Sequence, residues 1–209
     1  MRRIVLLSLF LTYLPLQVDA APSDDALTVL NSLSVKGRAA KTGYTRAQFT
    51  HWSDLDRNGC DARNDTLKRD LTALVFKVGT RDCKVISGSL LDPFSGKVIT
   101  FSSTKSNIDI DHVVALSNAW QTGAAYFDKT KRQQIANDPL NLLAVDFTLN
   151  RQKGDGDAAT WLPPLKSYRC DYVSRQVAVK VKYGLWVTQP EKDAIVKILE
   201  KCVGQKIPN

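Results

Sequence analysis

The sequence has few of the residues from which many metal and redox sites are built. Only His51 and His112 are histidines among the 209 residues, so a site that needs a cluster of histidine ligands is excluded. The four cysteines include no C-x-x-C pair, which argues against a zinc site. After residue 20 no apolar run is long enough to span a bilayer, and no repeat or glycine-, serine- or proline-rich linker divides the chain. We therefore expect one domain over residues 21–209, without membrane association.

The remaining composition is that of a folded protein with excess positive charge. Hydrophobic residues make up 44% and charged residues 24% of the chain, and the formal net charge is +8 at pH 7. A charge of this size favours polyanionic partners without identifying one.

Residues 1–20 have the pattern of a signal peptide. Arg2 and Arg3 form a positive start, residues 4–16 are an almost continuous apolar run, and residues 18–20 resemble a cleavage site. The apolar run is too short for a comfortable membrane anchor. We predict that this segment is removed and that the protein is secreted into the extracellular space.

The cysteine content agrees with export. An oxidising compartment would pair Cys60, Cys83, Cys170 and Cys202. Four cysteines allow three connectivities, and the sequence does not choose among them. Pairing of nearest neighbours would close two loops of modest length.

Hydrophobic periodicity and turn residues predict an α+β fold. Helices are expected at residues 24–35, 64–76, 117–125, 129–136, 168–183 and 191–202. A β-hairpin is expected at 84–101, with further strands at 108–116 and 140–145 and a polar, helix-forming turn after 147.

The residues best suited to catalysis lie between Asp109 and Lys153. Asp111 and His112 are adjacent in a predicted strand, and Asn141 and Asn150 follow in the next strand and the polar turn. Carboxylate and amide oxygens suit Mg²⁺ or Mn²⁺, and a neutral imidazole can take a proton from water. One metal, one base and surrounding cations suffice for phosphodiester hydrolysis. Because neighbours on a regular strand point to opposite faces, Asp111 and His112 converge only if the strand ends or twists there.

This set of residues resembles a known nuclease motif. Residues 111–114, Asn141 and residues 150–154 resemble the HNH, or ββα-metal, motif in the variant whose last histidine is an asparagine. Segments 58–65, 88–93 and 155–164 extend the match to a family of secreted HNH endonuclease-like proteins. The resemblance implies a disulfide-stabilised domain with a ββα-metal core at about residues 106–157, flanked by helices and a β-hairpin.

The resemblance also implies roles for individual residues. His112 would be the general base, Asp111 and Asn150 would hold one divalent metal, and Asn141 would fix the orientation of His112. An oxygen donor at position 150 favours Mg²⁺, with Mn²⁺ as the alternative. The leaving group would be the 3′ oxygen, which gives 5′-phosphate ends. Asp109 would share a strand face with Asp111, either as a supporting group or as a solvated carboxylate.

Several charged residues have two competing interpretations. Arg63, Arg151 and Lys153 are candidate substrate-binding residues that contact phosphate. The alternative for Arg63 is a structural pair with an aspartate, and the alternative for Arg151 and Lys153 is a solvated charge on a helix. Residues 54–65 resemble a calcium loop, but Asp65 stands where the bidentate glutamate is usual, so a turn rich in Asp and Asn is preferred. His51 has no set of acidic and amide residues of the kind that accompanies His112, and is interpreted as structural.

Two functional hypotheses follow. The first is a secreted, monomeric, metal-dependent endonuclease that hydrolyses DNA, with RNA as a further substrate, and has little sequence preference because no base-reading module is evident. The alternative is a non-catalytic secreted binding protein or effector on the same scaffold.

Overall fold

The computed structural model describes residues 24–105 and 107–208, and in them helices and strands are mixed along the chain. The predicted signal peptide, residues 1–20, lies outside the described residues. The α-helices are α1 (Ala26–Ser32), α2 (Ala62–Asp70), α3 (Leu116–Gln121), α4 (Lys129–Asn137), α5 (Phe147–Lys153), α6 (Arg169–Tyr183) and α7 (Gln189–Leu199). The strands are β1 (Thr72–Phe76), β2 (Val85–Leu91), β3 (Val98–Ser102), β4 (Ile108–His112) and β5 (Leu142–Asp146). Short 3₁₀ turns are η1 (Arg46–Gln48), η2 (Ala124–Tyr126) and η3 (Lys166–Tyr168).

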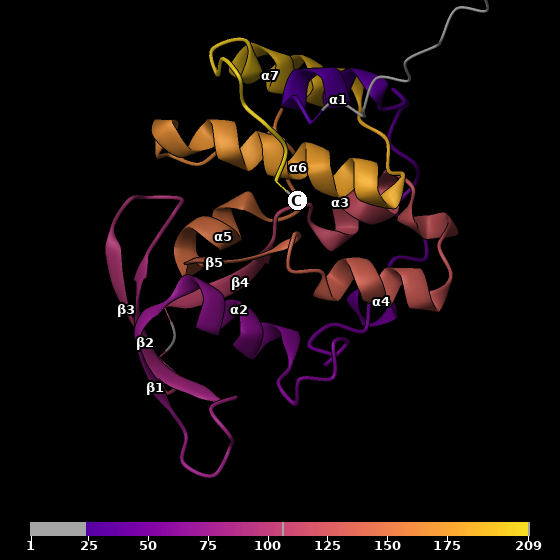
Figure 1. The fold of residues 1–209 in the computed structure, drawn as a ribbon. Helices are drawn as coiled ribbons and strands as arrows, with labels where there is room; N and C mark the ends of the chain where they lie inside the picture. The colour runs from indigo at the N-terminus through magenta and orange to yellow at the C-terminus, as the bar shows by residue number, and fades with distance from the viewer. Residues whose placement is uncertain (1–23, 106, 209) are drawn as a thin grey trace, which may run out of the picture.

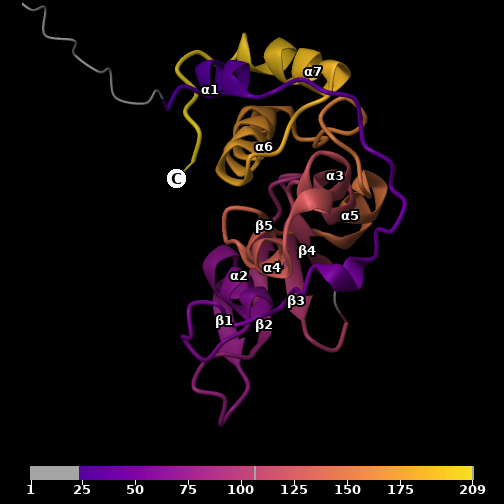
Figure 2. The same cartoon turned by 90° about the vertical axis from the view of Figure 1, so that its right-hand side faces the viewer.

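The strands form two antiparallel sheets. One has the order β1-β2-β3, and the other is the pair β4-β5, in which His112 lies opposite Leu142. Helices α1 and α7 pack against α6 at one end of the molecule, the three-stranded sheet lies at the other end, and β4-β5 lies between them (Figures 1 and 2). This arrangement confirms the predicted mixed α+β fold in a single domain.

The predicted hairpin is present, and its turn connects the two sheets. Strands β2 and β3 are joined through a turn in which Ser95 donates hydrogen bonds to the buried carboxylate of Asp92. Gly96 follows with a φ of 74°, a conformation that glycine adopts without steric cost. The other oxygen of Asp92 accepts a hydrogen bond from the backbone of Asp146, so the hairpin turn is tied to the end of β5.

Two predicted boundaries are wrong. The helix expected at 64–76 ends at Asp70, and the remaining residues form β1, because Leu71 is extended and the following segment pairs with β2. The strand expected at 108–116 ends at His112. After His112 the chain leaves the strand pairing, because the backbone N–H groups of Val113 and Val114 donate to Asn141 instead.

Helix packing builds the core at the other end of the molecule. Tyr172, Val173 and Val177 of α6 are buried against α1 and α7. Helix α6 ends at Gly184, whose φ of 68° turns the chain out of the helix, and α7 begins with a capping box between Thr188 and Glu191. No helix in the described ranges is long and apolar enough to cross a membrane.

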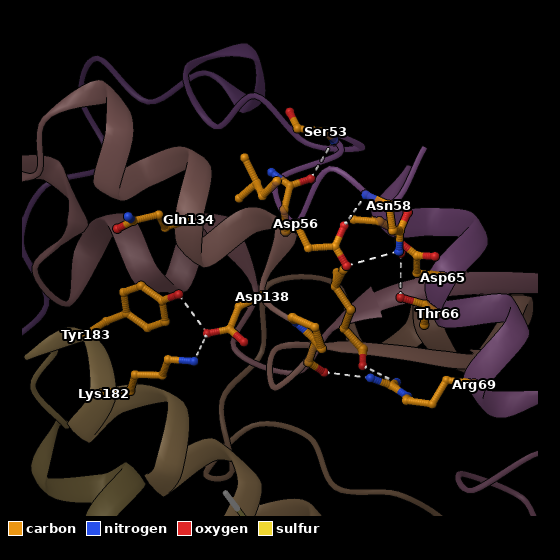
Figure 3. A pocket seen from close by; sticks show the side chains of 15 residues that line it. Ser53, Asp56, Asn58, Asp65, Thr66, Arg69, Gln134, Asp138, Lys182 and Tyr183 are labelled. Atoms are coloured by element: carbon orange, nitrogen blue, oxygen red, sulfur yellow. Dashed lines mark hydrogen bonds and ion pairs between the residues drawn. The ribbon is translucent and has the colours of Figure 1, made fainter. Parts of the chain in front are cut away.

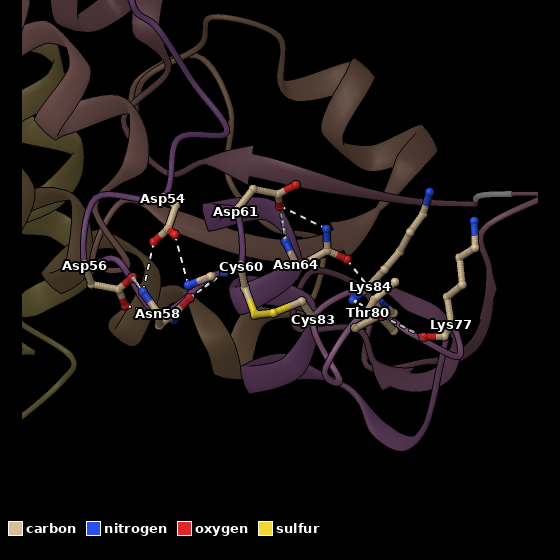
Figure 4. The surroundings of a disulfide bond; sticks show 12 residues. Asp54, Asp56, Asn58, Cys60, Asp61, Asn64, Lys77, Thr80, Cys83 and Lys84 are labelled. Atoms are coloured by element: carbon tan, nitrogen blue, oxygen red, sulfur yellow. Dashed lines mark hydrogen bonds between the residues drawn. A yellow bond between two sulfur atoms is a disulfide. The ribbon is translucent and has the colours of Figure 1, made fainter.

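The disulfides connect nearest neighbours in the sequence. Cys60 pairs with Cys83 and Cys170 pairs with Cys202, which selects one of the three possible connectivities. The first disulfide holds the start of α2 beside β2 (Figure 4). Asn64 reinforces this junction, because its side-chain oxygen accepts a hydrogen bond from the backbone of Val85.

Candidate active site

A cavity of about 530 Å³ lies beside the end of β4 and brings together most of the predicted site residues. From the predicted set it is lined by Arg63, Asp111, His112, Asn150 and Arg151. Residues that sequence reasoning did not single out also line it, among them Tyr44, Arg46, Trp52, Ser117 and Asp155. Asn141 and Lys153 do not line the cavity. Lys153 contacts Asp111 and His112, which do, whereas the side chain of Asn141 contacts Val114 and Ile135, which do not.

Strand alternation and helix α5 position the acidic side of the site. Asp109 and Asp111, two residues apart on β4, both contact α5: Asn150 Nδ2 lies 3.1 Å from Asp109 Oδ2, and Lys153 Nζ lies 2.8 Å from Asp111 Oδ1. Asn150 and Lys153 are three residues apart, which places them on one face of the helix. Asp146 caps the start of this helix by accepting a hydrogen bond from the backbone of Leu149.

His112 is buried at the last position of β4, with an exposed fraction of 4%. Its Nε2 lies 2.9 Å from the carbonyl oxygen of Ala136. Because a carbonyl only accepts, Nε2 carries the hydrogen and Nδ1 keeps a lone pair. The ring stacks on Trp52 with 5.9 Å between centroids. Burial lowers the pKa of His112 to about 3, against the opposing effect of the Ala136 bond, so the imidazole is neutral near pH 7.

Asn141 connects the segment that follows β4 to the end of α4. Its Oδ1 accepts a hydrogen bond of 2.8 Å from the backbone N–H of Val114, and its Nδ2 donates to the carbonyls of Val114 and Ile135. The side chain is fully buried. The segment after β4 and the end of α4 are therefore fixed relative to each other, and the Ala136 carbonyl beside Ile135 is the one that orients His112.

Replacing Asn141 by alanine is expected to lower the free energy of unfolding by about 3 kcal/mol, because three buried backbone groups lose their partner. Urea unfolding of the variant, followed by circular dichroism, measures this change. Asn31→Ala, at an exposed position of α1, is the matched control and is expected to change stability by less than about 0.5 kcal/mol. Equal stability of the two variants would contradict the bracing role of Asn141.

The sequence suggests that Lys153 contacts phosphate, but in the structure its side chain has other partners. Its side chain is buried, and Nζ lies 2.8 Å from both Asp111 Oδ1 and the carbonyl oxygen of His112. The ammonium group therefore binds the strand itself. Asp111 Oδ2 is also buried, and none of the residues that the structure describes donates a hydrogen bond to it. Burial raises the pKa of Asp111, and the ammonium of Lys153 opposes that increase.

The donor atoms at this site fit a hard divalent cation. No group of three or more histidine, cysteine, aspartate or glutamate residues suited to a metal occurs in the described part of the chain. A set of oxygen donors is nevertheless present: the unpartnered Asp111 Oδ2, the side-chain oxygen of Asn150, and Asp109 beside it. Such oxygens suit Mg²⁺ or Mn²⁺, which keep several water ligands.

The arginines at the cavity differ in their surroundings. Arg63 lies in the first turn of α2, and the Arg151 guanidinium lies 4.3 Å from the centre of the Phe147 ring. Neither forms an ion pair with a carboxylate of residues 24–105 or 107–208. Both therefore line the cavity with a positive charge that no carboxylate of the described residues pairs with.

A second cavity, of about 450 Å³, lies between α2, α4 and the end of α6 (Figure 3). Its charged groups are engaged by the fold. Asp138 accepts a hydrogen bond from Tyr183 and pairs with Lys182, and Arg69 donates to the carbonyls of Pro139 and Leu142. We assign this cavity no chemistry.

The turn that resembled a calcium loop borders this second cavity. The Asp54 carboxylate accepts hydrogen bonds from the backbone N–H groups of Asn58 and Gly59, and Asp56 also accepts from Asn58 (Figure 4). These contacts are those of a turn rich in Asp and Asn before α2. His51 is half-buried, with Nδ1 3.2 Å from the carbonyl oxygen of Phe49 and its ring edge-on to Trp52.

Comparison with known proteins gives one family and one similar protein. Residues 61–198 match the family described as GmrSD restriction endonucleases, C-terminal domain. An "Uncharacterized secreted protein" of Arthroderma benhamiae is 39% identical over 179 residues, which are 85% of this chain and 84% of that protein. No solved structure gives a significant match. The matched region contains the candidate residues of α2, β4 and α5 and Asn141, which directly precedes β5, but not Tyr44, Arg46 or Trp52.

Proposed function

The chain belongs to the family of the GmrSD restriction endonuclease C-terminal domain, and from this premise we propose that it is a divalent-metal-dependent endonuclease. Its reaction is the hydrolysis of phosphodiester bonds in DNA, with RNA as a further substrate. The observation that carries the proposal is that Asp111 and His112 of β4 and Asn150 of α5 line one cavity. Strand β4 pairs with β5, which leads directly into α5, and this order supports a ββα-metal core with α3 and α4 inserted between its strands.

In the proposed reaction, His112 acts as the general base. Its Nδ1 takes a proton from the attacking water, whose oxygen forms a bond to phosphorus while the bond to the 3′ oxygen breaks. Donation of the Nε2 hydrogen to the Ala136 carbonyl keeps Nδ1 free for this role. A phosphate anion in the cavity would stabilise the imidazolium form of His112. It would therefore raise the pKa of His112, which burial lowers.

Asp111 and Asn150 are the proposed metal ligands. When bound, a Mg²⁺ or Mn²⁺ ion would neutralise phosphate charge and stabilise the leaving oxygen. Lys153 holds Asp111 through Oδ1, which leaves Oδ2 as the oxygen for the cation. Arg63 and Arg151 would contact the phosphates of the substrate.

Secretion is part of the proposal. The signal-peptide pattern of residues 1–20 and the two disulfides support it, and the fungal relative is named a secreted protein. The net positive charge is that expected of a protein with a polyanionic partner such as a nucleic acid, and contacts to the backbone would give little sequence preference.

Cleavage of supercoiled plasmid tests this function. Residues 21–209 with oxidised cysteines are incubated with plasmid, and in parallel with RNA, in Mg²⁺, in Mn²⁺ and in EDTA. Nicking that requires a divalent metal is the expected result. Intact DNA and RNA under every metal condition would reject the nuclease and favour a non-catalytic binding protein.

A further inference from the structure

One wall of the candidate active site comes from outside the region that matches the family. The match begins at residue 61, whereas Tyr44, Arg46 and Trp52 lie before it and line the same cavity as His112. The segment 44–52 therefore lies outside the matched region, and it reaches the site where the chemistry is proposed.

The backbone that carries Arg46 is firmly held. The 3₁₀ turn η1 is closed by a capping box between Thr45 and Gln48. Phe49, directly after the turn, is fully buried and packs edge-on against Trp120, which Tyr44 also contacts. The position of Arg46 at the cavity is thus set by the fold rather than by a loose loop.

The charge of Arg46 is not used by the fold. No carboxylate of the described residues pairs with its guanidinium. The side chain lines the same cavity as His112, the proposed base. A cation placed beside a neutral imidazole, without an acidic partner, is suited to bind an anion at that place.

We infer that Arg46 binds a backbone phosphate of the nucleic-acid substrate, and that the segment 44–52 extends the substrate-binding surface beyond the family domain. The inference rests on the proposed function. Among the cavity arginines, Arg63 and Arg151 come from α2 and α5. Arg46 adds a contact from a separate element, so the substrate would be held by three parts of the chain.

Nucleic-acid binding without turnover tests the role of Arg46. Binding of a labelled DNA duplex by His112→Ala protein is measured in EDTA over a series of salt concentrations. Adding Arg46→Ala is expected to weaken binding and to make the slope of log K against log salt less steep by about 0.9, the value of one phosphate contact. Arg46→Lys, which retains the charge, is expected to restore most of the slope.

Lys197→Ala supplies the control, because Lys197 is an exposed cation on α7. It is expected to leave the salt slope unchanged. If the parent protein binds nucleic acid and Arg46→Ala has the same salt slope as the parent, the inference about Arg46 is wrong and the proposed function is unaffected. If the parent binds neither DNA nor RNA, the proposed function fails together with it. Arg46→Gln, checked by circular dichroism, replaces the alanine variant if the latter does not fold.

Discussion

Replacing His112 by alanine is expected to lower the rate of metal-dependent plasmid nicking by about 10²–10⁴-fold, the usual contribution of general acid–base catalysis. The physical reason is the tautomer. Because the Ala136 carbonyl holds the Nε2 hydrogen, Nδ1 is the nitrogen with a lone pair to accept a proton, and alanine removes it. Initial rates of nicking in Mn²⁺ and Mg²⁺ measure the effect.

His51→Ala is the matched control for this experiment. His51 is the other histidine of the sequence, it lies near His112, and it does not line the cavity. The control is expected to nick plasmid at close to the wild-type rate. Circular dichroism and thermal unfolding establish that His112→Ala is folded. Wild-type activity in folded His112→Ala would show that another group is the base.

The sequence predicts which residues meet at the cavity better than it predicts the contacts that each of them makes. Asp111, His112 and Asn150 line one cavity, as expected from their residue types and spacing, while their roles stay predictions. The convergence of Asp111 and His112 depended on where the strand ends, and the structure ends it at His112. That end is made by hydrogen bonds to Asn141, a long-range contact that no local pattern encodes.

Other features escaped prediction because tertiary contacts outweigh local preference. Residues 72–76 continue the apolar periodicity of α2, yet they pair with β2 as a strand. Trp52 has a φ of 62°, unfavourable for a large side chain, and is nevertheless stacked on His112. Nothing in the sequence around Trp52, which follows His51, predicts that its ring stacks on His112.

Lys153 is the residue whose role changed most between sequence and structure. A lysine next to a predicted metal ligand suggests a phosphate contact, but its side chain is fully buried, and its ammonium binds Asp111 and the His112 carbonyl. Asp111 and His112 both belong to β4, so the contact holds α5 against that strand. The same contact uses Oδ1 of Asp111 and leaves Oδ2 without a donor among the described residues, so it bears on the stability of the fold and on the site.

Lys153→Met is therefore expected to lower the free energy of unfolding by about 3–5 kcal/mol, because it leaves the Asp111 carboxylate buried without a counter-ion. Urea unfolding at pH 7 in EDTA measures the loss without any contribution from bound metal. The double variant Asp111→Asn, Lys153→Met removes both charges and is expected to recover most of the lost stability. A double variant no more stable than Lys153→Met would show that packing of the lysine side chain, and not its charge, holds the strand.

Lys180→Met provides the matched control, since Lys180 forms a second fully buried ion pair, with Glu191, outside the cavity. Both lysine variants are expected to lose comparable stability. Only Lys153→Met is expected to weaken Mn²⁺ binding, measured by calorimetry at a temperature where both variants are folded, because only there does Asp111 lose its fixed orientation. Equal Mn²⁺ affinity in the two variants would separate the Lys153 contact from the proposed metal site and leave it a purely structural ion pair.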